Sequence, residues 1–428
     1  MKKTIIAISL VITLLFSSFA LSSCVLFEDD KTAGNQQTGD SGGENTDKGT
    51  SDTTINVEGG DNYNVNITPT TQQNILAASK SVLSAVSIDC TFERNRYNWS
   101  GAVVGTTTAA ASGAGVIYKL DKTAGTAYVI TNFHVIYDAY CNTANKVSDN
   151  ITLYLYGQEA TKYAIPAKYV GGSMNYDLAV LKVENSQVLI ESNAMEATVA
   201  NSDDISILET VIAVGNPEGI GISATVGHIN VDSENITIAM TVDGYSRGIS
   251  LRCIRIDAAV NSGNSGGGLF NDKGELIGIV NAKLSDSSVD NIGYAIPSNV
   301  AKAIADNIID YCDGTDKESV FRCKLGVGVG ATAASTKYDV ETGKIHKLET
   351  VVISSIDENS PVSELLKEMD IVNSITIDGV KHNVTRTFHV IDSMLNARVG
   401  SSVIMNITRN GETFDVTIPM TEDMLTAY

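Results

Sequence analysis

The sequence predicts a mostly β protein, in which a barrel or sandwich of short strands is followed by a smaller α+β domain. Short runs rich in β-branched and aromatic residues recur from about 75 to 310, and many are separated by Gly, Asn or Asp clusters. Thirty-six glycines against six prolines favour strands and turns over a helix bundle. From about 324 the pattern changes to strands interrupted by helical segments.

Length and composition exclude several classes of protein. A chain of 428 residues predicts two or three domains at ~150 residues each. The hydrophobic share of 43% supplies enough apolar material for packed cores, so global disorder is excluded. The net charge of −20 repels phosphate backbones, so we expect no nucleic-acid partner. The body is not a multispanning membrane protein, because the only long apolar run lies at the N-terminus.

Residues 1–23 have the features of a lipoprotein signal peptide. Lys2 and Lys3 precede an apolar stretch, Ile5–Phe16, as in export signals. The junction Leu-Ser-Ser-Cys24 resembles the bacterial lipoprotein signal, in which the cysteine is acylated and becomes the first residue. An uncleaved anchor helix or an ordinary secretory signal is the alternative. Lipidation of Cys24 would attach the protein to the cell membrane on its outer, extracytoplasmic face.

Residues 24–71 are predicted to form a flexible acidic tether. Between positions 25 and 71 the chain has nine acidic residues and two lysines, and no aromatic residue lies between Phe27 and Tyr63. Such a segment cannot bury enough apolar surface to offset its ordering entropy. Apolar and polar residues alternate on both sides of Gly59-Gly60, which indicates no more than a small hairpin within the tether.

Five cysteines lie beyond Cys24: Cys90, Cys141, Cys253, Cys312 and Cys323. Export would place them under oxidising conditions, and their odd number leaves at least one unpaired. Two alternatives stay open, namely buried free thiols and a Cys312–Cys323 bridge between two domains. No spacing resembles a zinc site, and we expect neither a metal nor a cofactor.

Three residues of the predicted domain at 72–313 are candidates for catalysis. His134 follows a strand-like run, Asp177 precedes another, and Ser265 lies in Gly-Asn-Ser-Gly-Gly. Each alone is a weak signal, but their order within one β-rich segment is more specific. A serine hydroxyl needs a base to take its proton, a histidine has a suitable pKa, and a carboxylate can orient that histidine.

The surroundings of these residues resemble the HtrA/Deg group of trypsin-like serine proteases. The matching runs are Thr-Asn-Phe-His134-Val, Tyr-Asp177-Leu-Ala-Val-Leu and Asn-Ser-Gly-Asn-Ser265-Gly-Gly-Gly-Leu, with further similarity at 214–219 and 293–299. The resemblance implies a chymotrypsin-like double β-barrel, with His134 and Asp177 in the first barrel and Ser265 in the second. It also implies a homo-oligomer, a trimer in this family.

The resemblance also assigns supporting roles. The backbone N–H groups of Gly263 and Ser265 would form the oxyanion hole. Ala259 and Val260 would floor the specificity pocket, with Ile279 as another wall. None of the three carries a charge, so we expect cleavage after small or medium apolar residues.

The chain departs from the family pattern at several positions. Gly268 and Ser262 stand where proline is usual, and Phe133 stands where asparagine is usual. None of these changes removes a reacting group. Asn264 replaces the carboxylate that pairs with a new N-terminus in digestive enzymes, so activation by propeptide cleavage is not expected.

The pattern Gly263-x-Ser265-x-Gly267 also formally fits the nucleophile elbow of α/β-hydrolases. That fold requires a helix directly after the serine. The residues that follow predict a strand, a turn at Asn271–Gly274 and a strand at Leu276–Val280 instead.

The predicted domain at 324–428 resembles the PDZ domain of the HtrA/Deg group, with an apparent insertion near 332–348. We expect a short helix ending at Met369, a helix over 387–397 and a closing hairpin at Asn410-Gly411. An unrelated α+β domain is the alternative. In a PDZ domain a peptide C-terminus would add as a strand, with its carboxylate on the backbone N–H groups of Leu325, Gly326, Val327 and Gly328.

The sequence therefore predicts a membrane-tethered, extracytoplasmic serine endopeptidase for protein quality control. It would hydrolyse unfolded or misassembled exported proteins by a His-Asp-Ser acyl-enzyme mechanism, regulated by peptide C-termini bound at the PDZ domain. The alternative is a peptide-binding or chaperone protein on the same scaffold with little proteolytic activity. The presence of all three candidate residues favours the protease.

Overall fold

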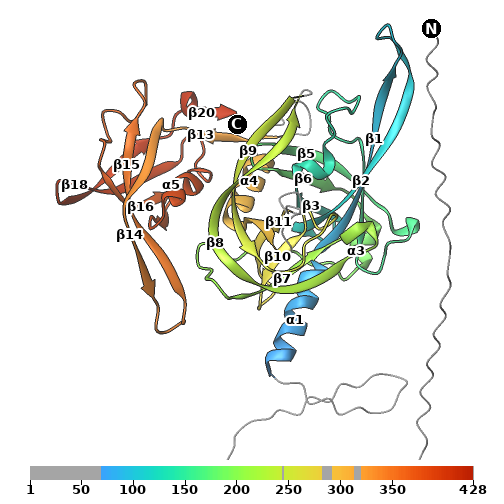
Figure 1. Cartoon of the computed structure of the whole chain (residues 1–428), viewed down its shortest axis with the longest axis horizontal. Helices are drawn as coiled ribbons and strands as arrows, with labels where there is room; N and C mark the ends of the chain where they lie inside the picture. The colour runs from blue at the N-terminus through green and yellow to red at the C-terminus, as the bar shows by residue number, and fades with distance from the viewer. Residues whose placement is uncertain (1–68, 243–244, 282–291, 313–319, 428) are drawn as a thin grey trace, which may run out of the picture. The chain divides into compact units, whose positions relative to one another are not determined.

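The computed structural model describes residues 69–242, 245–281, 292–312 and 320–427 (Figure 1). Residues 67–428 form one compact unit, distinct from residues 1–66. The predicted signal peptide, Cys24, nearly all of the tether and its small hairpin lie outside the described residues. Within the described ranges, no helix is both long and apolar enough to cross a membrane.

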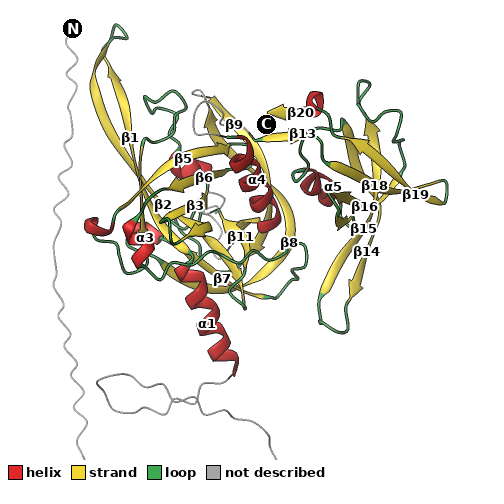
Figure 2. Cartoon of the chain, turned by 180° about the vertical axis from the view of Figure 1, so that it is seen from behind, coloured by secondary structure: helices red, strands yellow, loops and turns green. Residues whose placement is uncertain are grey.

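Residues 85–183 close into a six-stranded antiparallel barrel, in the order β1-β2-β3-β6-β5-β4 (Figure 2). Its residues are apolar where they face the interior, and Leu178–Val183 is buried along almost its whole length. The strands are β1 Ala85–Tyr97, β2 Val103–Asp121, β3 Thr126–Thr131, β4 Asn150–Leu155, β5 Ile165–Ser173 and β6 Leu178–Val183. Short helical segments lie between them: α2 Phe133–Ile136, η1 Thr161–Tyr163 and α3 Gln187–Glu191.

A second antiparallel barrel follows, in the order β10-β11-β12-β9-β8-β7. Its elements are β7 Thr210–Gly215, η2 Pro217–Gly219, β8 Ser223–Val242, β9 Tyr245–Ile256, β10 Gly268–Asn271, β11 Leu276–Val280 and β12 Gly293–Pro297. The two barrels are the architecture that the resemblance implied. A strand, β10, follows Ser265 in place of a helix, so the α/β-hydrolase alternative is wrong.

Two helices flank the barrels: α1 Pro69–Leu83 and α4 Ser298–Tyr311. The apolar face of α4 buries Val300, Ile304 and Ile308, which recur every four residues. This helix contacts β5 and β6 of the first barrel and β11 and β12 of the second, so it joins the two barrels. Ser298 is its first residue, and its hydroxyl donates to the carbonyl of Ala200 at 2.7 Å.

The C-terminal domain is an antiparallel sheet in the order β14-β15-β16-β18-β19, with β17 paired to β16 and the helix α5 against it. Its elements are β13 Phe321–Cys323, β14 Val327–Tyr338, β15 Ile345–Ile356, β16 Ile371–Ile377, β17 Val380–Asn383, α5 Thr387–Met394, β18 Ser402–Arg409, β19 Glu412–Pro419, η4 Glu422–Met424 and β20 Leu425–Ala427. A separate pair, β13 and β20, joins the two ends of the domain. The predicted α+β class is confirmed.

One local expectation in this domain is wrong. The segment before Met369, predicted to be a helix, is a series of turns, and Met369 itself takes a φ of 69°. Of the two alternatives left open for the cysteines, the structure has buried free thiols at Cys90, Cys141, Cys253 and Cys323, so no Cys312–Cys323 bridge forms. The apparent insertion near 332–348 is an antiparallel hairpin that continues β14 and β15 as far as Tyr338 and Ile345.

Candidate active site

The short helix α2 places His134 directly after the end of β3. Its neighbour Phe133 is buried, with its ring centroid 5.2 Å from that of Tyr137. A Cβ on Gly172 would lie 2.7 Å from the Phe133 ring, so this glycine makes room for the ring. The departure from the family pattern at Phe133 is thus accommodated by packing, and it leaves the position of His134 in the helix intact.

Asp177 is fully buried at the start of β6 and accepts three hydrogen bonds on its carboxylate. Oδ1 accepts from the backbone N–H of His134 at 3.0 Å, and Oδ2 lies 2.7 Å from His134 Nδ1. A carboxylate at this distance holds the proton on Nδ1. His134 Nε2 is then the nitrogen able to accept a proton, which is the tautomer that a general base requires.

The third bond to the Asp177 carboxylate comes from Asn281, a residue that the sequence analysis did not single out. Asn281 Nδ2 donates to Asp177 Oδ2 at 2.7 Å, and the Asn281 side chain is fully buried. Asn281 directly follows β11, so a strand of the second barrel reaches the acid of the first. A buried polar residue directly after an apolar strand was the available signal.

The loop that carries Ser265 packs tightly against the first barrel. The backbone carbonyl of Ser265 accepts a hydrogen bond from the backbone N–H of Ala114 at 2.9 Å. Gly266 has a φ of 84°, and a Cβ there would lie 2.2 Å from both the Ala114 carbonyl and Thr131 Oγ1. Only glycine fits this approach, and it brings the serine loop to the end of β3, just before His134.

The candidate nucleophile, Ser265, and the candidate base, His134, are not joined by a hydrogen bond in this structure. Within the described ranges, neither Ser265 Oγ nor His134 Nε2 has a hydrogen-bond partner. This contact is often long in unliganded enzymes and shortens once substrate binds. The structure therefore shows the acid–base pair assembled and the serine loop docked, with the last contact unmade.

The predicted oxyanion donors are held by a second glycine turn. Gly263 has a φ of 96°, and a Cβ there would lie 2.1 Å from the Asn216 carbonyl. Asn216 is buried, donates its backbone N–H to the Gly263 carbonyl at 3.2 Å and bonds Ser112 Oγ through its side chain at 3.0 Å. The N–H groups of Gly263 and Ser265 find no acceptor among the described residues, so both are available to a ligand.

The predicted specificity residues differ in exposure. Ala259 is exposed and its carbonyl accepts from Thr225 Oγ1 at 2.9 Å, while Val260 is half-buried. Ile279 has no exposed surface and belongs to the hydrophobic core. Their part in substrate choice stays a prediction.

The predicted carboxylate-binding segment of the C-terminal domain precedes and begins an edge strand. β14 lies at one edge of its sheet, so one side of Val327–Val329 is unpaired, and α5 contacts this strand. Gly326 takes a φ of 65°, and the Leu325 carbonyl accepts from Ser360 Oγ at 2.7 Å. The role of Leu325, Gly326, Val327 and Gly328 in binding a carboxylate stays a prediction.

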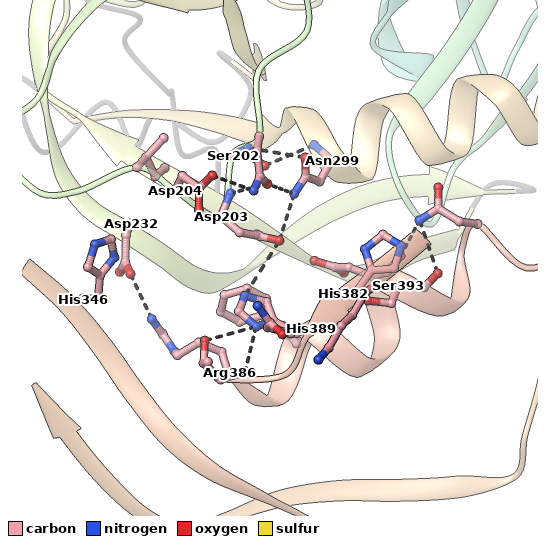
Figure 3. A pocket seen from close by; sticks show the side chains of 18 of the residues that line it. Ser202, Asp203, Asp204, Asp232, Asn299, His346, His382, Arg386, His389 and Ser393 are labelled. Atoms are coloured by element: carbon pink, nitrogen blue, oxygen red, sulfur yellow. Dashed lines mark hydrogen bonds and ion pairs between the residues drawn. The ribbon is translucent and has the colours of Figure 1, made fainter. Parts of the chain in front are cut away.

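A polar cleft of about 810 Å³ lies between the second barrel and the C-terminal domain, away from the three candidate catalytic residues (Figure 3). Arg252 Nη2, on β9, lies 2.5 Å from Asp392 Oδ2, on α5. The guanidinium carbon of Arg252 lies 4.0 Å from the centre of the Phe388 ring. Arg386 forms an ion pair with Asp232 of β8 at 2.9 Å. Burial raises the pKa of Asp392 to about 6, an effect that Arg252 opposes.

The tip of the inserted hairpin also contacts the second barrel. Lys344 Nζ lies 2.9 Å from Glu209 Oε1 and donates to the Asp204 carbonyl at 2.6 Å. Ser206 exchanges hydrogen bonds with the backbone of Ile345 at 3.1 and 3.2 Å. The insertion and α5 thus fix the C-terminal domain on the barrel through polar contacts that sequence reasoning did not find.

Comparisons with known proteins agree with this site. Residues 113–279 match the family model described as a trypsin-like peptidase domain. Serine protease Do-like HtrA of Bacillus subtilis (strain 168) is 33% identical over 314 residues, which cover 71% of this chain and 62% of that protein. Serine protease Do-like HtrB of the same strain is 31% identical over 301 residues, which cover 64% of this chain and 61% of that protein. The chain thus matches about three fifths of the length of these relatives.

Solved structures of HtrA-type proteases are also similar. HtrA-type protease AlgW with a tripeptide is 24% identical, with a TM-score of 0.49, over 83% of this chain and 98% of that one. The same protease with a decapeptide is 24% identical, with a TM-score of 0.48, over 81% of this chain and 98% of that one. Over residues 113–279 the chain is therefore similar to trypsin-like peptidase domains, and over a longer stretch to serine proteases of the HtrA type.

Proposed function

We propose that this protein is a serine endopeptidase that cleaves unfolded or misassembled exported proteins while it is anchored to the outer face of the cell membrane. The observation that carries the proposal is the buried carboxylate of Asp177, which lies 2.7 Å from His134 Nδ1. The docking of the Ser265 loop at the end of β3 adds the third group. Anchoring is inferred from the Leu-Ser-Ser-Cys24 junction in the sequence.

The chemistry follows from the positions of these groups. His134 Nε2 takes the proton of Ser265 Oγ, and the oxygen attacks the carbonyl carbon of the peptide bond. The oxyanion that forms accepts hydrogen bonds from the N–H groups of Gly263 and Ser265. His134 then gives its proton to the leaving amine, and water releases the acyl group by the same steps. Asp177 stabilises the imidazolium throughout.

Regulation is assigned to the C-terminal domain acting as a PDZ domain. The unpaired edge of β14 beside α5 offers a place for a peptide to add as a strand. The same helix contacts the second barrel through Phe388 and Asp392, so a peptide bound there adjoins the contact between the domains. We propose a homo-oligomer, a trimer by family resemblance, as the assembly in which the protease loops become ordered.

Labelling with a fluorophosphonate tests the proposed chemistry directly, because this reagent reacts with an activated serine. We expect the wild-type chain to be labelled at Ser265, as mapped by mass spectrometry, and Ser265→Ala to be unlabelled. Ser262→Ala is a matched control, since Ser262 is an exposed serine in the same loop. A folded wild-type chain that is not labelled, but still suppresses aggregation of an unfolded protein, would favour the chaperone alternative.

A further inference from the structure

The hairpin formed by β1 and β2 extends past the first barrel and ends in the only tryptophan of the chain, Trp99 (Figure 1). The two strands pair as far as Tyr97 and Val103. Asn98 closes the turn, because its Oδ1 accepts from the backbone N–H groups of Ser100 at 3.0 Å and Ala102 at 2.9 Å. Trp99 therefore sits at the apex of a defined turn.

The tip of this hairpin, residues 96–104, presents apolar surface to solvent. Trp99 is 99% exposed, and Tyr97, Val103 and Val104 are each more than half exposed. Exposed apolar residues scattered singly are ordinary, but a cluster at one tip marks an interaction surface. Tryptophan and tyrosine, with an apolar ring and a polar atom, are the residues enriched at the boundary between membrane and water.

The outer part of the hairpin, residues 94–108, differs in charge from the whole chain. From 94 to 108 there are two arginines and no carboxylate, in a chain with a net charge of −20. Arg94 forms an ion pair with Asp138. Arg96 is exposed and pairs with no carboxylate among the described residues, so its charge is available to an anionic partner.

The reach of the hairpin keeps its tip away from the acidic body. An isolated β-bridge joins Arg94 of the hairpin to Cys141. Strand β1 continues three residues beyond Arg94 to Tyr97, which is about 10 Å at ~3.3 Å per residue, and the turn that carries Trp99 lies beyond it. Charges are screened over ~8 Å at physiological salt, so repulsion between the body and an anionic surface is weak when only the tip touches it.

We propose that the tip, residues 96–104, inserts into the headgroup layer of an anionic lipid bilayer. Its aromatic and valine side chains enter the interface while Arg96 pairs with lipid phosphates. A second copy of the chain is a poorer occupant, because a two-fold contact between tips would set one Arg96 against another. The inference goes beyond the proposed proteolysis and does not require it, since neither Trp99 nor Arg96 belongs to the catalytic site.

The fluorescence of Trp99 reports directly on the tip, because the chain has no other tryptophan. The full chain carrying Cys24→Ala, free of lipid, is titrated with vesicles of phosphatidylcholine alone or mixed with phosphatidylglycerol at 0.15 M salt. We expect a blue shift of the emission, protection from acrylamide quenching and co-sedimentation with the anionic vesicles only. Cys24→Ala removes the proposed lipid, and the emission of Trp99 separates binding by the tip from any binding by residues 1–23.

Variants assign the binding to the tip. Arg96→Gln should weaken the vesicle affinity by about fivefold, the value of one basic residue near an anionic surface. Val103→Ser with Val104→Ser should weaken it further, whereas Val226→Ser is a matched control that removes an equally exposed valine from β8. Labelling of Ser265 by a fluorophosphonate should be the same in all of these variants.

Several outcomes would overturn the proposal. The tip does not bind lipid if anionic vesicles leave the Trp99 emission unchanged. Equal binding to neutral and anionic vesicles would reject the charge argument on which the proposal depends. A blue shift that grows with protein concentration in the absence of vesicles would identify a second copy of the chain as the occupant instead.

Discussion

Substitution of Asn281 tests whether this residue of the second barrel positions the Asp177 carboxylate of the first barrel. Asn281→Ala removes the donor 2.7 Å from Asp177 Oδ2 and leaves a fully buried carboxylate with one hydrogen bond fewer. A hydrogen bond to a charged group contributes ~1.5–3 kcal/mol. If that stabilisation acts on the transition state, kcat should fall by roughly 10- to 150-fold. KM should change little, because Asn281 does not face the substrate.

The assay is the steady-state cleavage of a fluorogenic peptide, together with the urea dependence of unfolding for each variant. Asn307→Ala is the control, since Asn307 is equally buried but its Oδ1 accepts from the backbone of Phe321 at 2.9 Å, away from the catalytic residues. Both substitutions should lower stability, and only Asn281→Ala should lower kcat. An Asn281→Ala enzyme that is folded and retains the wild-type kcat would refute the positioning role.

Three further predictions concern substrate choice, the C-terminal domain and its contact with the barrel. Products of an unfolded protein should end mainly in small or medium apolar residues, because Ala259 and Val260 carry no charge, and mass spectrometry showing mostly cuts after Lys or Arg would reject this pocket. Amidating the C-terminus of an apolar peptide should weaken its binding to the Ser265→Ala chain by roughly tenfold, measured calorimetrically, and equal affinities would argue against carboxylate capture at 325–328. Burial raises the pKa of the Asp392 carboxyl from 3.8 to about 6, so the folded state binds the carboxyl proton more tightly than the unfolded state does. The stability that this proton adds to the folded state is complete below pH 4 and is lost as the pH rises through about 6. Relative to Asp392→Asn, the wild-type chain should therefore lose up to roughly 3 kcal/mol of unfolding free energy between pH 4 and 7, and parallel profiles in urea unfolding would contradict this.

The sequence predicted the parts of the fold that local patterns determine. The short apolar strands and the hairpin at Asn410-Gly411 follow from spacing and turn chemistry, and the structure contains them. The pairing of His134 with Asp177 was available only through the family resemblance, because 43 residues separate them and no local rule joins such positions.

The rest depended on contacts that the sequence does not encode locally. Asn281 reaches Asp177 across 104 positions, and Arg252 of the second barrel meets Asp392 of the C-terminal domain. A polar residue on a helix such as α5 looks like a solvated face until a second domain covers it. The segment before Met369 shows the opposite case, in which a pattern that predicts a helix forms turns instead.

The most direct test of the central claim is the hydrolysis of an unfolded, casein-like protein by purified wild-type and Ser265→Ala chains. Circular dichroism should show the same fold for both. The account predicts cleavage by the wild-type chain and a loss of about 10⁴- to 10⁶-fold in rate for Ser265→Ala, the cost of removing a nucleophile that works with its base. Near-normal cleavage by a clean, folded Ser265→Ala preparation would contradict it.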